Sequence, residues 1–531
     1  MKSKAIHFSQ LSLKKDNPFI ATASPIGQGE GKWLRPCSAE KSRRPRPKKS
    51  SIIRPAIEGD LKRSYNTILD INKAHILMLA KTGIITEDVE KKLLAATAQI
   101  ESEKDHPTFE INPNVEDLYF NLERYLIKMT GLEVGGQQHT ARSRNDLFAT
   151  EIRIDTRKVY LKLAEMFITL RRTYLELARK NLDTVMSGYT HMQPSEPITF
   201  AHYLSGVLSA MGRDYDRYAR AWLALNLCPL GGCSMGSTSF PIDRRYTAEL
   251  LGFDGPVQNS LDCVASRDYL LEITTTLAQT AMTMSRTALD LYNWSTPEYG
   301  YIEVDDSCAV CSSIMPQKKN PFTLEHVKAK AAHMEGFMIS VYNTMKNVIF
   351  SHGRDTSVEA PRYFYTALSE MEADFALLNV TVKTLSVRKE RMYENAARNF
   401  CTVTELANYL VRHDGISFRE AHEIIAHVVG NMCDRRLTAA DINRDAIDEA
   451  SRALYGFETK LTDEMIREAL DPRRVVLEKT ALGGTHPDEV SRQLDLIEAQ
   501  IKNDEKVLEE RRAQLAKADA LLAQKVKEAL S

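Results

Sequence analysis

Apolar residues recur at steps of three and four along most of this chain, which is the spacing of helices that bury one face. Between Asp146 and about Asn181 hardly any residue breaks the pattern. The apolar positions of this run are Ile152, Val159, Leu163, Phe167, Leu170, Tyr174 and Leu177. Further long helices are predicted over about 198–227, 262–295, 323–347 and 360–385. Helices of this length must cover their apolar stripes by packing on one another, so the pattern predicts an all-α bundle.

Both ends of the chain beyond these runs also favour helices. An early helix pair is indicated by Ile68, Ile71, Ile76, Leu79, Ile84 and Ile85. After Thr485 a charged helix is predicted, with apolar residues at Leu494, Ile501, Leu508, Leu515 and Leu522. The alternate heptad line carries Asp504, Arg511 and Lys525, which makes a two-position coiled-coil seam poor. We favour a helix lying along the protein's own surface, and an oligomerisation zipper is the alternative.

Residues 1 to about 55 differ from the rest, because they are basic and rich in Pro, Ser and Gly. Their composition predicts a mostly disordered tail. A nuclear-type or polyanion-binding patch at Arg43–Lys49 is one alternative. An organelle transit segment is another, although Asp16, Glu30 and Glu40 argue against it.

Composition and charge argue against several classes of protein. The 531 residues carry a formal net charge of -1, which gives no global electrostatic case for a nucleic-acid partner. No apolar run is long enough to span a bilayer and the start has no signal-peptide core, so we expect a cytoplasmic protein. Eight cysteines in this length do not indicate a disulfide framework. For the pair Cys308 and Cys311 we favour free thiols over a redox pair or a metal site.

The segment from Ser312 to Pro321 concentrates two hydroxyls, two ammonium groups and an amide just before a predicted helix. Asn320 is a good N-cap and Pro321 a good first helical residue, and the helix is expected from Thr323 to about Lys346. Backbone N–H groups and the helix dipole would then face the loop. This arrangement predicts a receptor for a dianion with serines beside it, whereas composition alone is also consistent with a structural cap.

The Ser312–Pro321 string resembles the signature of the fumarase/aspartase superfamily, in the form typical of its argininosuccinate lyase branch. Two more segments match in the expected order, Gln138–Asp146 and Gly188–Pro194. Shorter matches follow at Pro229–Gly231, Phe240–Arg244, Asn259–Asp262, Phe418–His422 and Ala469–Pro472. The resemblance covers about Ser64 to about Leu496, which is most of the chain.

The resemblance implies a central bundle of long helices flanked by two small helical domains. We expect the basic tail at 1–55, the N-terminal domain at 56–145 and the bundle at 146–390. The C-terminal domain is expected at 391–487, followed by the charged helix at 488–531. It also implies a homotetramer whose active sites combine the three motifs from three different chains, with no cofactor and no metal.

By the same resemblance, the chemistry is removal of a proton next to a carboxylate while an amine leaves the neighbouring carbon. Ser312 matches the catalytic serine, which needs donors and positive charge to act as a base. Lys318 and Asn320 would hold the carboxylate that gains charge, and Ser313 would bind a substrate oxygen. Lys319 is expected to be structural or solvent-facing.

The other two motifs supply further matches. Arg144, Asn145, Ser143 and Thr190 match groups that bind substrate carboxylates, and an arginine fork suits that task. His191 matches the histidine near the leaving group, a general acid or proton relay. In the family this histidine is paired with a glutamate, and Glu325 matches that glutamate. A carboxylate beside an imidazole favours the protonated form of the imidazole. His139 is expected either to support the carboxylate site or to be structural.

The chain departs from the branch at several positions. Cys311 and Ala141 stand where glycine is usual, and Asn72 where serine is usual. The stretch that holds the substrate beyond its succinyl half matches 352–360, where His352, Ser357 and Ala360 replace tyrosine, glutamine and lysine while Arg354 and Asp355 persist. The fumarate half of the site is therefore kept, and the amine half is rebuilt.

Our leading hypothesis is a cofactor-free carbon–nitrogen lyase that eliminates fumarate from an N-substituted aspartate, or adds an amine to fumarate in reverse. The substrate would be a succinyl amine resembling argininosuccinate. One alternative is a true argininosuccinate lyase with a divergent pocket. Another is a non-catalytic structural protein on this fold. A nucleic-acid module rests only on the basic tail, and we do not expect it.

Overall fold

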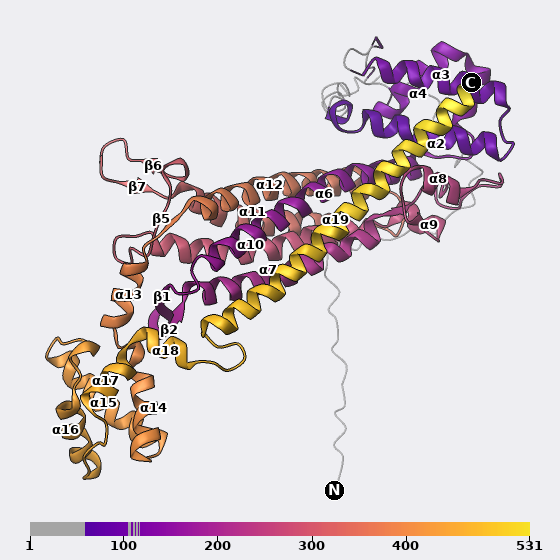
Figure 1. Cartoon of the computed structure of the whole chain (residues 1–531). Helices are drawn as coiled ribbons and strands as arrows, with labels where there is room; N and C mark the ends of the chain where they lie inside the picture. Colours follow the sequence, from indigo (N-terminus) through magenta and orange to yellow (C-terminus); the bar gives the residue numbers. More distant parts are fainter. Residues whose placement is uncertain (1–58, 105–107, 110–111, 113–114, 116) are drawn as a thin grey trace, which may run out of the picture. The chain divides into compact units, whose positions relative to one another are not determined.

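The computed structural model describes residues 59–531 except 105–107, 110–111, 113–114 and 116 (Figure 1). The tail predicted at 1–55 lies outside the described residues. Five long helices make the bundle: α6 (Arg144–Arg179), α7 (Phe200–Leu225), α10 (Asp268–Trp294), α11 (Phe322–Lys346) and α12 (Ala360–Thr384). α6 packs against α7 and α12, and α10 packs against α7, α11 and α12. Their apolar faces share one core that includes Phe167, Phe200 and Phe364, which confirms the all-α bundle.

Shorter helices form two further cores. Near the start of α6 they are α2 (Tyr65–Lys81), α3 (Glu87–Ser102), α4 (Leu118–Thr130), α5 (Leu132–Gly135), η1 (Gly136–His139) and α8 (Arg244–Leu250). The short helix α9 (Ser260–Ala265) packs in a small separate cluster with Val257. After α12 come α13 (Lys389–Arg398), η4 (Phe400–Thr402), α14 (Val403–Asp414), α15 (Phe418–Asp434), η5 (Ala439–Asp441), α16 (Arg444–Tyr455), α17 (Asp463–Leu470) and α18 (Pro472–Glu478). Leu69, Leu93 and Leu122 belong to the first core, and Leu406, Ile424 and Ile466 to the second.

The strands of the described residues are short and pair two by two. They are β1 (Val185–Thr190) with β2 (Gln193–Thr199), β3 (Leu227–Cys228) with β4 (Gly255–Pro256), β5 (Ile302–Glu303) with β8 (Ser386–Val387), and β6 (Val310–Cys311) with β7 (Lys319–Asn320). All pairs are antiparallel except β3–β4. The 3-10 turn η2 (Asp306–Cys308) precedes β6, and the π-turn η3 (Asp355–Glu359) leads into α12. Two of these pairs hold predicted site residues.

The predicted run over 262–295 is interrupted in the structure. α9 ends at Ala265 and α10 starts at Asp268, because Ser266 is extended and Arg267 has φ -137° and ψ 25°. The Arg267 guanidinium turns back and donates to the carbonyl oxygens of Ser266 and Val264, at 2.7 and 3.4 Å. A side chain therefore satisfies backbone groups that a continuous helix would have used.

The C-terminal helix α19 (Pro487–Leu530) packs on α6, α7, α2, α3 and α8 of its own chain (Figure 1). Two of the polar residues that interrupt the predicted coiled-coil seam, Asp504 and Arg511, have specific partners. Asp504 accepts a hydrogen bond from Arg171 at 2.5 Å, and Arg511 lies over the ring of Trp222, 5.0 Å from its centroid. These contacts are those of a helix on the protein's own surface. Among the described residues, no helix is both long and apolar enough to cross a membrane.

One carboxyl group in the bundle, that of Asp374, is buried without a hydrogen-bond partner among the described residues. Asp374 in α12 is fully buried, and neither of its carboxylate oxygens has a hydrogen-bond partner among the described residues. Burial raises the pKa of Asp374 to about 8, against the nearby charge of Lys330, which lowers it. The folded protein therefore binds a proton at Asp374 between about pH 4 and pH 8 that the unfolded chain has released.

We expect Asp374→Asn to remove this pH dependence. The raised pKa of Asp374 means that its contribution to stability falls as pH rises from about 4 to about 8, by roughly 5 kcal/mol in total. Thermal unfolding at pH 5, 6, 7 and 8 should show that the stability of Asp374→Asn relative to the wild type increases at each step. Glu370→Gln, one turn away, is the control: Lys330 lowers the pKa of Glu370, so this carboxylate is mainly ionised in both the folded and the unfolded state at all four pH values. Parallel curves for the wild type and Asp374→Asn would contradict this.

Candidate active site

The start of α6 holds the residues of the first motif. Ser143 is the N-cap residue: its hydroxyl accepts from the backbone N–H of Asn145 at 3.2 Å. The Arg144 guanidinium donates to Asp117 Oδ2 at 3.2 Å, and the Asn145 amide donates to the carbonyl of Ser234 at 3.1 Å. The ion pair of Arg144 therefore reaches across to the start of α4, whereas Ser143 makes the cap that fixes the helix start.

Asp146 ties this helix start to a neighbouring loop. One carboxylate oxygen accepts from the backbone N–H of Ser143 at 3.0 Å. The other accepts from Gly231 and Cys233 at 2.8 and 2.9 Å. Burial raises the pKa of Asp146 to about 6, although the three N–H donors lower it. Cys233 has a φ of 54°, so this carboxylate also holds a residue in the left-handed region that disfavours side chains.

A buried hydrogen-bond network lies beside the first motif. Arg142 donates to Asn72 Oδ1 at 2.8 Å and to the Tyr119 hydroxyl at 3.1 Å. His139 Nδ1 lies 2.8 Å from the same hydroxyl and 2.7 Å from Glu123 Oε1. Asn72 and His139 thus belong to one connected network. Asn72 is buried and holds Arg142, whereas the imidazole of His139 is partly exposed.

His352 and Ser357 lie in the turn between α11 and α12. Burial, together with nearby positive charges, lowers the pKa of His352 to about 4, so the imidazole is neutral near pH 7. These charges belong to Arg267, Arg144 and Arg354. Ser357 is buried in η3, where its backbone N–H donates to the carbonyl of Gly353. The structure therefore brings the predicted amine-half residues to the Arg144 end of the bundle.

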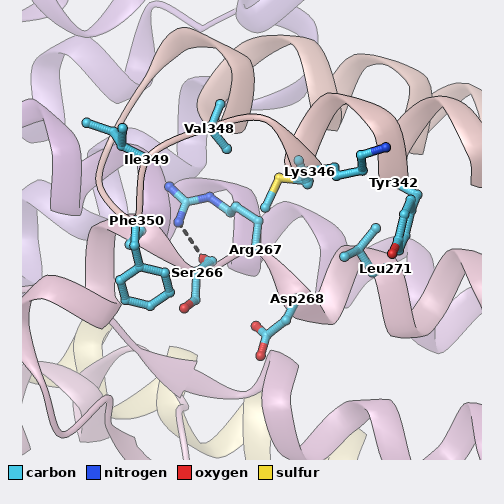
Figure 2. Close-up of a pocket in the computed structure, with 11 residues that line it drawn as sticks. Ser266, Arg267, Asp268, Leu271, Tyr342, Lys346, Val348, Ile349 and Phe350 are labelled. Carbon is cyan, nitrogen blue, oxygen red and sulfur yellow. Dashed lines mark hydrogen bonds between the residues drawn. The ribbon is translucent and has the colours of Figure 1, made fainter. Parts of the chain in front are cut away.

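Figure 2 shows the pocket beside this cluster, at the start of α10. It encloses about 260 Å³ and is lined by Arg267, Lys346 and a largely apolar wall that includes Leu271, Val348 and Phe350. The Arg267 side chain is fully buried, and its Nε and Nη2 have no hydrogen-bond partner among the described residues. A buried cation with unused donors is costly unless an anion approaches it.

The second motif forms the turn of the β1–β2 hairpin. Thr190 pairs with Gln193, so His191 and Met192 are the two loop residues. Both have positive φ, 54° and 61°, as two-residue hairpin loops of the primed type require. Thr190 and His191 are exposed. The hairpin is anchored from its other side, because the hydroxyls of Tyr189 and Tyr301 lie 2.6 Å apart.

The serine loop spans 312–318 between β6 and β7. The Ser312 hydroxyl accepts from the backbone N–H groups of Ile314 and Met315 at 3.3 and 3.0 Å. The backbone N–H of Ser312 donates to the carbonyl of Lys318 at 3.1 Å. Ser313 and Lys318 are exposed. Lys319 forms ion pairs with Glu303 and Asp306, at 3.4 and 2.6 Å, as a structural lysine would.

The predicted helix start after the loop is wrong by one residue. Asn320 lies in β7, paired with Val310, and does not cap α11. Pro321 is the N-cap residue with φ -80° and ψ 65°, and the helix begins at Phe322. The strand pairing of Asn320 fixes its backbone in an extended form, which prevents it from turning into the helix. The predicted end at Lys346 is confirmed.

Glu325 lies in the first turn of α11 and is exposed. Its Oε1 accepts a hydrogen bond from the Tyr292 hydroxyl at 3.2 Å. Among the described residues, His191 and Glu325 form no ion pair within the chain. The partner expected for the histidine is therefore available, but a single chain does not bring the two together.

Helix lengths show how far apart the motifs lie. α6 has 36 residues and is about 54 Å long, with Arg144 at its start and His191 beyond its end. α11 has 25 residues and is about 37 Å long, with Ser312 before its start and His352 beyond its end. Because His352 lies near Arg144, the serine loop and the hairpin share the opposite end (Figure 1). One chain thus holds the predicted site residues in two groups, at opposite ends of its bundle.

Sequence reasoning missed three buried or half-buried polar residues next to the predicted ones. They are Arg142, Arg267 and Tyr292. Arg142 lies inside the first motif and Arg267 follows the Asn259–Asp262 match by five residues, so both were within reach of the motif comparison. Tyr292 had no signal, because its role depends on the packing of α10 against α11.

Comparisons with known proteins agree with this architecture. The family model described as Lyase matches residues 60–336, and the one described as Argininosuccinate lyase C-terminal matches residues 400–477. Argininosuccinate lyase 1 from Shouchella clausii (strain KSM-K16) is 44% identical over 470 residues, covering 88% of this chain and 94% of that protein.

Two solved structures are similar over the same extent. EDDS lyase in complex with formate superposes with a TM-score of 0.83 at 33% identity, covering 88% of this chain and 92% of that chain. A variant of EDDS lyase with bound fumarate gives a TM-score of 0.82 at 33% identity, with the same coverage. The chain therefore belongs to the argininosuccinate lyase-like branch of the fumarase/aspartase superfamily and is a carbon–nitrogen lyase.

Proposed function

We propose that this enzyme eliminates fumarate from an N-substituted aspartate of the argininosuccinate type, or adds an amine to fumarate in reverse. The observation that carries the proposal is the retention of all three motifs in a chain 44% identical to a protein named argininosuccinate lyase 1. The bound fumarate of the similar EDDS lyase variant supports the dicarboxylate half of the substrate.

In this proposal Ser312 removes the proton from Cβ of the substrate, and the electron pair is held as a carbanion next to the carboxylate. Lys318 and Asn320 stabilise the negative charge that gathers on this carboxylate. The C–N bond then breaks with anti geometry, and the amine nitrogen takes a proton from His191. Arg144, Asn145, Thr190 and Ser313 hold the substrate oxygens. No redox step is needed.

The active site of this proposal is shared between copies of the chain in a homotetramer. Support comes from helix length, since about 54 Å of α6 separate Arg144 from the hairpin that carries His191. A complete site then needs the Arg144 end of one copy beside the Ser312 and His191 ends of others.

The residues predicted to face the amine half of the substrate differ from those usual in the branch. A neutral imidazole at position 352, with three guanidinium groups nearby, differs chemically from the tyrosine usual in the branch. We therefore propose a succinyl amine other than argininosuccinate. The alternative is argininosuccinate itself, and it is favoured by the 44% identity over 88% of the chain.

The test is mass spectrometry of the products formed from fumarate and a panel of amines. The panel contains arginine, ammonia, diamines and amino acids, and Ser312→Ala is the control. We expect an adduct with one class of amine and none with the control protein. An adduct with arginine alone would establish the alternative. If no amine reacts, measurement of fumarate binding separates a narrow amine requirement from failure of the proposal.

A further inference from the structure

The end of α10 places a tyrosine against the carboxylate of Glu325. The Tyr292 hydroxyl donates to Glu325 Oε1 at 3.2 Å, and its ring packs against the core of the bundle. α10 and α11 pack closely along their lengths. The position of this hydroxyl is therefore set by the bundle, whereas Glu325 itself lies on the exposed first turn of α11.

Among the residues that the structure describes, no cation forms an ion pair with the Glu325 carboxylate. Lys328, one turn along α11, holds its Nζ over the ring of Tyr292, 4.0 Å from the centroid. Within the described part of the chain Lys328 forms no ion pair with Glu325. On the side of α11 that faces α12, Lys330 and His333 pair with Glu370 instead. Glu325 thus keeps free lone pairs for an imidazole.

We propose that Tyr292 is a positioning residue that holds Glu325 and tunes the acidity of the His191–Glu325 pair across two copies of the chain. This inference rests on the proposed function. A hydrogen bond to a carboxylate withdraws negative charge from it, so the carboxylate raises the proton affinity of an adjacent imidazole less. Burial raises the pKa of Tyr292, and Glu325 raises it further, so the phenol remains a donor at neutral pH.

The test is the pH profile of kcat/KM for Tyr292→Phe, measured in the elimination direction with the succinyl amine that the wild type cleaves. Removing the hydroxyl should shift the basic limb upward by about 0.5 to 1 pH unit, because Glu325 then holds the imidazolium proton more tightly. Folding should be unaffected, since the ring is kept and the lost hydrogen bond is exposed. A basic limb that is unshifted or lower would overturn the proposal.

Tyr203→Phe is the matched control. Tyr203 donates to Asp290 Oδ2 at 2.7 Å, which is also a tyrosine–carboxylate bond between long helices, but it involves no predicted site residue. Its pH profile should equal that of the wild type. In a Glu325→Gln background, Tyr292→Phe should cause no further shift, and an undiminished shift there would exclude action through Glu325.

Different results would overturn the lyase activity and the role of Tyr292. A wild-type protein that turns over no succinyl amine overturns the proposed function together with this inference. A wild type that is active, with Tyr292→Phe indistinguishable from Tyr203→Phe, overturns the inference alone.

Discussion

Ser312→Ala is expected to lower kcat by roughly 10³- to 10⁴-fold, to no detectable turnover in an ordinary assay. Alanine cannot take the Cβ proton, and no neighbouring hydroxyl replaces it, because Ser313 is assigned to a substrate oxygen. The Ser312 hydroxyl accepts two backbone N–H bonds within an exposed loop, so its loss should change the unfolding temperature little. Turnover of the substrate and thermal unfolding are measured on the same preparation.

Ser313→Ala is the control within the loop, with an expected loss of about tenfold that falls mainly on KM. A Ser312→Ala enzyme that retains a tenth of wild-type activity would contradict the assignment of the base. Mixing Ser312→Ala with Arg144→Ala, after joint unfolding and refolding, adds a test of the shared site. The mixture should regain activity that neither variant has, because some sites then combine two intact halves.

Asp504→Ala is expected to destabilise the protein by about 3 to 5 kcal/mol. Arg171 in α6 is fully buried, and Asp504 is the carboxylate that faces it, at 2.5 Å. Arg171 Nε and Nη2 already lack partners among the described residues, so the variant would leave a buried guanidinium without any counter-charge. Denaturant unfolding followed by circular dichroism measures the loss.

Glu505→Ala is the matched control, one residue along the same helix. Glu505 binds Arg172 through both oxygens, but both side chains are more than a third exposed, so the expected cost is at most about 1 kcal/mol. Replacing both partners of the buried pair, as Arg171→Met with Asp504→Leu, should recover most of the stability, because the burial of charge is removed. Equal losses for Asp504→Ala and Glu505→Ala would contradict the argument.

The sequence predicted the long helices well, because their length gives the period of 3.6 residues many repeats. The run predicted from Asp146 to about Asn181 corresponds to α6, Arg144–Arg179. The prediction over 262–295 missed the break at Ser266 and Arg267, since a buried arginine that binds nearby carbonyls leaves no trace in the apolar pattern. Asp504 interrupts the apolar heptad pattern of α19. Its ion-pair partner, Arg171, is more than 300 residues away, so the local pattern gives no sign of the pair.

The candidate site was predictable only as motifs. The segments that carry Arg144, His191 and Ser312 were found from local strings, but no local string shows that one chain holds them at opposite ends of its bundle. The N-cap assignment of Asn320 failed because a strand pairing with Val310 outcompeted a local preference. The family resemblance is confirmed by the comparisons, and the non-catalytic alternative has no support from them.

The contacts of α19 constrain the order in which the chain can fold as it is synthesised. Leu522, Val526 and Leu530 pack into the core built by α2, α3 and α8, and Lys91 binds the carbonyl of Ser531 across 440 residues. Because α2, α3 and α8 are synthesised before α19, the apolar surface that α19 covers stays open until α19 emerges from the ribosome. Until α19 has been synthesised, that surface is open to chaperones, and a product truncated before α19 exposes it permanently.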